Sequence, residues 1–239
     1  MLLDKMSLNI QELNFTLFAK DLKPGTIHPV VLQYLGIIPH EWELMENPVY
    51  SDRELKLIFT NQVRLIIQPN RIIFGETVGQ KTVRDIQIPL IISAYLQAFS
   101  NINYQGLSIN PSGYVPFNSD EEANKYMSEN LLPSRPWKTF ADNSVSAVSL
   151  KLAYPYKKGS FYIDINQANL EVGDRTMAAV WFAGNFNYQL HDDNAANRLQ
   201  SLQTLIEQWK TDVNKFGNFI SKKFLGTTKA SEVSVFPLQ

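Results

Sequence analysis

The chain has 239 residues, of which 44% are hydrophobic and 12% aromatic, which is enough to bury a sizeable core and excludes a disordered protein. Because 22 Lys and Arg residues face 23 Asp and Glu residues, the net charge is -1, so we expect no nucleic-acid partner. The absence of cysteine excludes disulfides, thiolate nucleophiles and sulfur-ligated metals.

The first residues, MLLDKM, bring an acid and a base together with no apolar stretch behind them, so we expect neither a signal peptide nor an anchor. Apolar stretches such as 86–94 are interrupted by polar residues and fall short of the roughly 20 residues that a bilayer requires. We therefore expect no membrane partner and a cytoplasmic location.

The first elements are a strand and a short helix. Residues 8–20 alternate apolar Leu13, Phe15 and Leu17 with polar residues, which predicts a half-buried strand. Residues 28–38 have apolar side chains at helical spacing before Pro39, which predicts a short helix. The apolar residues of that helix are Val30, Val31, Tyr34, Leu35 and Ile38.

A hairpin and a second helix follow. Extended segments are expected at 41–50 and 54–60, and the hairpin strands 62–67 and 71–76 are joined by the turn Gln68-Pro69-Asn70. Asp85 is the expected cap of an amphipathic helix that runs to about Ser100. A strand at 105–110 is then closed by Pro111-Ser112-Gly113.

The composition shifts between 111 and 144 to Pro, Ser, Asn and charge, with one short helical pattern at 120–131. Beyond this segment we expect three meander strands, at 145–156, 160–166 and 177–190, and then the longest helix, at 194–224. The predicted units are therefore 1–115, a connector at 116–143, and 144–239, and the two larger units could form one compact domain.

These elements predict an α+β protein in which antiparallel sheets are covered by amphipathic helices, with a long C-terminal helix. Both halves share the order strand, hairpin strands, helix. A duplicated strand-hairpin-helix unit is a hypothesis from this topology.

His191-Asp192-Asp193 is the densest cluster of titratable groups. It could act as a metal ligand or general base, but we favour an Asp192 or Asp193 cap on the following helix, with His191 in an exposed loop. His28 and His40 flank the first helix without the spacing of a zinc site. No nucleophile elbow or phosphate-binding loop is present. We therefore assign no catalytic, cofactor-binding or metal-binding residue and no cofactor.

Aromatic residues gather on two of the meander strands. Phe161, Trp181, Phe186 and Tyr188 could line a ligand cavity between sheet and helix, although we favour core packing for this set. Trp137 lies in the polar connector, where a large indole either covers the edge of the core or contacts a partner.

Three consecutive segments carry a resemblance to a known family. The hairpin VRLIIQPNRIIFGE, the helix IQIPLIISAYLQAF and the strand YQGLSIN resemble the central part of a sporadically distributed bacterial family of conserved hypothetical proteins. In that family a later meander and long helix close the chain. The resemblance implies no activity and no functional residue.

The sequence is most consistent with a non-catalytic protein-protein interaction or scaffold protein that binds a protein partner, associates with itself as a homodimer, or both. The alternatives are a small-molecule or lipid-binding module and a chaperone-like binder that resembles the sheet-and-helix export chaperones. A metal-dependent hydrolase that uses His191 has the least support.

Overall fold

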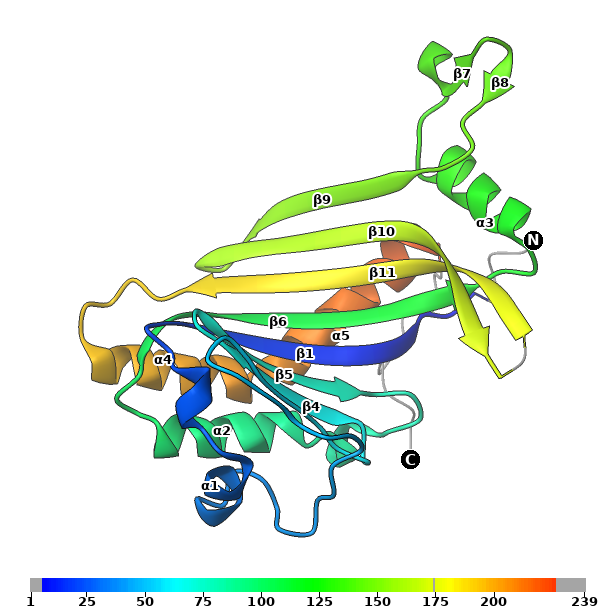
Figure 1. Cartoon of the computed structure of the whole chain (residues 1–239). Coiled ribbons are helices and arrows are strands. Elements are labelled where there is room, and N and C mark those ends of the chain that lie inside the picture. The colour runs from blue at the N-terminus through cyan, green and yellow to red at the C-terminus, as the bar shows by residue number, and fades with distance from the viewer. Residues whose placement is uncertain (1–5, 174, 227–239) are drawn as a thin grey trace.

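The computed structural model describes residues 6–173 and 175–226. Within them, nine strands form one antiparallel sheet in the order β2-β3-β4-β5-β1-β6-β11-β10-β9, and helices α2, α4 and α5 lie along one of its faces (Figure 1). The predicted α+β class with antiparallel strands and covering helices is thus confirmed.

The strands of the sheet are β1 Asn9–Lys20, β2 Val49–Tyr50, β3 Leu55–Ile58, β4 Val63–Gln68, β5 Arg71–Thr77, β6 Asn103–Pro116, β9 Ser149–Tyr156, β10 Gly159–Val172 and β11 Arg175–Gln189. A separate hairpin consists of β7 Thr139–Phe140 and β8 Asn143–Ser144. The helices are α1 Pro29–Tyr34, α2 Ile88–Ala98, α3 Asp120–Lys125, α4 Ala195–Glu207 and α5 Trp209–Phe219.

Strand β1 pairs with both β5 and β6 near the middle of the sheet. As its alternation predicts, Leu13, Phe15 and Leu17 are fully buried. Their burial excludes water from a continuous apolar layer, which is the main favourable contribution to folding.

Strand β6 is longer than expected. Pro111-Ser112-Gly113 was predicted to end the strand, but all three residues pair with β1. The register shifts at a bulge between Ile10 and Glu12 of β1, and a proline is tolerated in a strand near such an irregularity. Between residues 106 and 116, β6 also pairs with β11, so one sheet runs through both of the predicted larger units (Figure 1). Residues 227–239 of the second unit lie outside the described residues.

The N-terminus of helix α2 is capped by a residue of strand β5. Asp85 was predicted as the cap, but it belongs to a short 3-10 turn, Val83–Asp85, where it forms a capping box with Thr82. The buried carboxylate of Glu76 on β5 instead accepts hydrogen bonds from the backbone N–H groups of Gln87 and Ile88 at 2.8 and 3.1 Å. A carboxylate at this position complements the positive end of the helix dipole.

The predicted helix at 194–224 is two helices and a final π-helical turn, Ile220–Phe224. The backbone leaves helical geometry at Gln208, with φ −86° and ψ 3°, so α5 takes a different direction from α4 (Figure 1). Both helices still bury an apolar face, because Leu202 and Ile206 of α4 and Trp209, Val213 and Phe216 of α5 are buried. In the described part of the chain no helix has the length and apolar character needed to cross a membrane.

Candidate functional site

An apolar groove lies beside helix α1, at the end of the molecule away from the β7-β8 hairpin (Figure 1). It has a volume of about 610 Å³, within the range of roughly 300–1,000 Å³ typical of ligand pockets. Its lining comes from α1 and its cap, the following loop, β2 and the residue after β3, and consists of His28, Pro29, Val30, Gln33, Ile38, Trp42, Glu43, Leu44, Pro48, Tyr50 and Phe59.

Exposed apolar side chains concentrate in the segment that supplies most of the groove lining, and three of them, Val30, Leu44 and Tyr50, line the groove itself. Of the twelve large hydrophobic residues that are exposed in the described chain, eight lie between residues 30 and 50. Tyr34 is 83% exposed and Val30 is 60% exposed. Contiguous apolar surface of this kind marks binding sites, whereas isolated exposed apolar residues need no explanation. The eight are Val30, Val31, Tyr34, Leu35, Leu44, Met45, Val49 and Tyr50.

Local sequence explains why the helix presents this surface. The Nδ1 atom of His28 accepts a hydrogen bond from the N–H of Val30 at 3.3 Å and so caps α1. Gly36, at φ +68°, ends the helix in the left-handed conformation that glycine adopts without strain. Within α1 only Leu32 is buried. Four of the five residues of the predicted apolar stripe are exposed, and the fifth, Ile38, is buried beyond the end of the helix.

The floor and rim of the groove are held by specific contacts. The rings of Trp42 and Phe59 meet edge to face with their centroids 5.2 Å apart. The hydroxyl of Tyr50 donates a hydrogen bond to the carbonyl of Gly25, which fixes the loop opposite α1. The groove is therefore formed before any partner binds, which lowers the entropic cost of binding.

The segment that forms one side of the groove is acidic. Between residues 40 and 56 the chain has five carboxylates against only Arg53 and Lys56. Lys56 forms an ion pair with Glu46 at 3.0 Å, and Glu43 lines the groove itself. Since the whole chain has a net charge of only -1, this negative charge is a local property that favours a basic partner.

Trp137, the predicted partner contact, lies at the base of a second exposed apolar feature. We call residues 131–148 the arm: its hairpin projects away from the sheet (Figure 1). Trp137 is 58% exposed and Phe140, at the hairpin tip, is 86% exposed. The indole therefore does not cover the edge of the core, the other role that the sequence left open.

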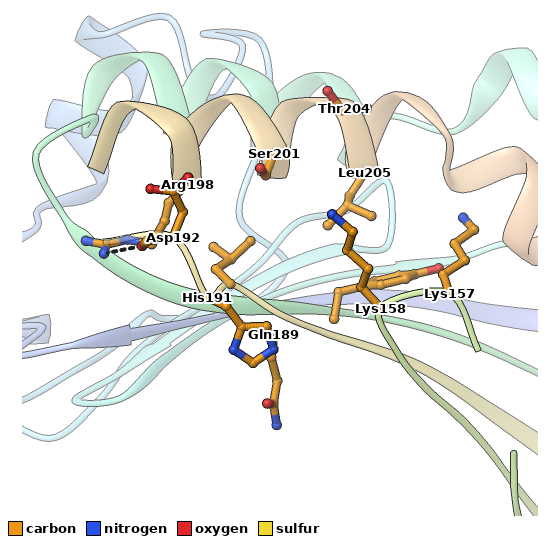
Figure 2. A pocket seen from close by; sticks show the side chains of 11 residues that line it. Lys157, Lys158, Gln189, His191, Asp192, Arg198, Ser201, Thr204 and Leu205 are labelled. Carbon is orange, nitrogen blue, oxygen red and sulfur yellow. Dashed lines mark hydrogen bonds between the residues drawn. The ribbon is translucent and has the colours of Figure 1, made fainter. Parts of the chain in front are cut away.

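A different cleft, of about 660 Å³, contains His191. It lies between α4, the end of β11 and the β9-β10 turn, and Figure 2 shows the His191 ring pointing away from α4 while Lys158 reaches toward that helix. Arg198 donates to the backbone carbonyls of Asp192 and Asp193 at 2.9 and 3.3 Å, so its charge has a structural role.

The cap of α4 is neither of the two predicted aspartates. Asn194 accepts hydrogen bonds from the N–H groups of Ala196 and Asn197, and Asp192 supports this cap by accepting from the N–H of Asn194 at 2.8 Å. Asp193 contributes only its backbone carbonyl, which accepts a hydrogen bond from Arg198. His191 is exposed, as the loop interpretation predicted, and the described residues contain no group of three His, Asp or Glu side chains that could hold a metal ion.

Behind this cleft lies a buried carboxylate that the sequence analysis did not single out. Asp212 on α5 is fully buried and accepts hydrogen bonds from the hydroxyls of Tyr188 and Tyr156 at 2.5 and 2.8 Å, and from Lys157 Nζ at 3.1 Å. Burial, together with the negative charge of Asp212, raises the pKa of both tyrosines far above the ordinary value. These hydroxyls therefore stay protonated as donors, which makes the network a structural link between α5 and the sheet.

The four aromatic residues proposed as a pocket lining do not share one face. Phe161 and Phe186 stack at 4.5 Å on the helix-covered face, where they line a shallow cavity of about 380 Å³, and Tyr188 borders the larger cleft. Trp181 of β11 lies on the opposite face, where its partner on the neighbouring strand β6 is Tyr114. Burial of the first three residues agrees with the core packing that we favoured.

No family model and no curated protein matches this chain, so the site is interpreted from its own geometry.

Proposed function

We propose that this protein is a non-catalytic binding module that engages a protein segment in the apolar groove beside α1. The observation that supports this most is that eight of the twelve exposed large hydrophobic residues of the described chain lie between residues 30 and 50, the segment that supplies most of the groove lining, and that three of the eight line the groove itself. Burying a large apolar side chain is worth about 1.5–3 kcal/mol, so two such contacts supply about 3–6 kcal/mol of the roughly 8 kcal/mol that micromolar binding requires, and rim contacts must supply the rest.

The acidic surroundings specify the chemistry of the partner. Carboxylates around an apolar floor favour a segment that combines Lys or Arg with aromatic or aliphatic side chains, and they disfavour an acidic segment of the same hydrophobicity. The cytoplasmic location and the homodimer expected from the sequence remain part of this proposal.

Fluorescence polarisation with two synthetic peptides tests the proposal. One peptide alternates Arg and Lys with Trp and Phe, and the other replaces each basic residue by Glu. We expect the basic peptide alone to bind, with an affinity that falls as salt is added. Equal binding of both peptides, or of neither, would contradict the proposal. Preference for unfolded client proteins regardless of charge would support the chaperone-like alternative.

A matched pair of variants locates the binding site. Val30→Glu places a charge at a residue that lines the groove and is 60% exposed, whereas Leu90→Glu does the same at a residue of α2 that is 69% exposed and lies outside the groove lining. The first variant should abolish binding of the basic peptide and the second should leave it unchanged. The opposite pattern would place the binding surface on α2.

A further inference from the structure

We infer that the segment bound in the groove is the arm of a second copy of this chain, an inference that rests on the proposed function. The arm contains the sequence Arg135-Pro136-Trp137-Lys138-Thr139-Phe140, in which basic and aromatic residues alternate around a proline and a threonine. Lys138 Nζ is bound by carbonyl groups of its own chain, so Arg135 supplies the positive charge and Trp137 and Phe140 supply the apolar surface that the groove favours.

The hairpin of the arm is a minimal structure. Its two strands pair through Thr139 with Ser144 and Phe140 with Asn143, the N–H of Val145 donates to the carbonyl of Lys138 at 2.9 Å, and the turn residues Ala141 and Asp142 both have positive φ, as in a type I′ turn. An isolated two-stranded hairpin is marginally stable in water. The exposed aromatic residues of such a hairpin become buried only when a second surface covers them.

The base of the arm is fixed to the body of the protein. Lys138 Nζ donates to the carbonyl groups of Ser128 and Leu132, and Asn124 Nδ2 donates to the carbonyl of Ser146 at 2.8 Å. These contacts hold both ends of the hairpin, so Trp137 and Phe140 are presented in one arrangement. A preorganised arm loses less entropy on docking than a flexible segment would.

The arm and the groove lie at opposite ends of the molecule (Figure 1), so the arm cannot fold back into its own groove and the contact must join two copies. Two different surfaces meet in this contact. A contact of this kind closes into a dimer or ring if the rotation between copies permits, and otherwise extends into a chain.

Sedimentation velocity of the full chain tests this assignment. We expect concentration-dependent association that the arm variant Trp137→Ala/Phe140→Ala and the groove variant Val30→Glu each weaken by roughly 30-fold or more, the size of a hot-spot loss. Leu90→Glu should associate like the unaltered chain. Because all four positions are exposed, circular dichroism should show the same fold for every variant.

Mixing the two defective variants gives the sharpest result. The arm variant retains an intact groove and the groove variant retains an intact arm, so the mixture should form a complex that neither forms alone. Association that both variants leave unchanged, or a mixture that stays monomeric although each variant is folded, would overturn the inference.

The outcome also separates this inference from the proposed function. A chain that is monomeric at every concentration, yet binds the basic aromatic peptide in a manner that Val30→Glu abolishes, would refute the arm as occupant and leave the groove as a binding site. Absence of both association and peptide binding would refute both.

Discussion

Replacing Asp212 with alanine tests whether the buried network joins α5 to the sheet. Asp212 is fully buried, so its removal leaves the buried hydroxyl of Tyr188 without its acceptor at 2.5 Å, which costs about 1–3 kcal/mol. The pair with Lys157 contributes about 1 kcal/mol more, because the lysine side chain is 32% exposed and solvent screens it. Tyr156 retains Lys215 as a partner at 2.9 Å and adds little.

We therefore expect Asp212→Ala to lower the free energy of unfolding by about 3 kcal/mol, measured by urea denaturation. Asp164→Ala is the matched control: Asp164 pairs with Lys151 at 3.5 Å on the surface, so its loss should cost at most about 1 kcal/mol. If the two substitutions lower stability equally, the network does not carry the structural role assigned to it here.

Three further perturbations follow from the fold. Glu76→Ala should cost about 3 kcal/mol in urea denaturation, because it removes the cap of α2 and the buried partner of a lysine; a loss below about 1 kcal/mol would contradict the cap. Gly75→Ala should cost about 1–3 kcal/mol, since the new Cβ would lie 2.5 Å from Nε of Arg64, and an unchanged Tm would show that Arg64 moves freely. Burial raises the pKa of Tyr95 and Tyr104 above 10. Because these tyrosines ionise first in the unfolded chain, stability should be constant below about pH 10 and fall as the pH rises further. A Tm that stays level above pH 10 would refute this.

The strands and helices were largely predictable because their apolar periodicity follows from local geometry. Long-range packing decided the rest. The stripe on residues 30–38 has the pattern of a core-facing helix, yet only Leu32 of α1 turns inward and Tyr34 faces solvent. The orientation of a six-residue helix depends on the chain around it, so periodicity alone could not identify the groove.

The two buried carboxylates left signals that could have been found. Glu76 occupies an inward position in the alternation of β5, two residues after buried Phe74. Asp212 interrupts the apolar stripe of α5 between Trp209 and Phe216. A charged residue at a core-facing position needs partners, but only the fold shows that these come from strands distant in the sequence.

The most direct test of the groove as a binding site is chemical-shift mapping of the isotopically labelled protein with an unlabelled peptide of the sequence Arg135–Phe140. We expect the backbone resonances of residues that line the groove, Val30, Trp42 and Tyr50 among them, to shift saturably as the peptide is added. Shifts confined to the cleft around His191, or no saturable shifts at all, would contradict the account.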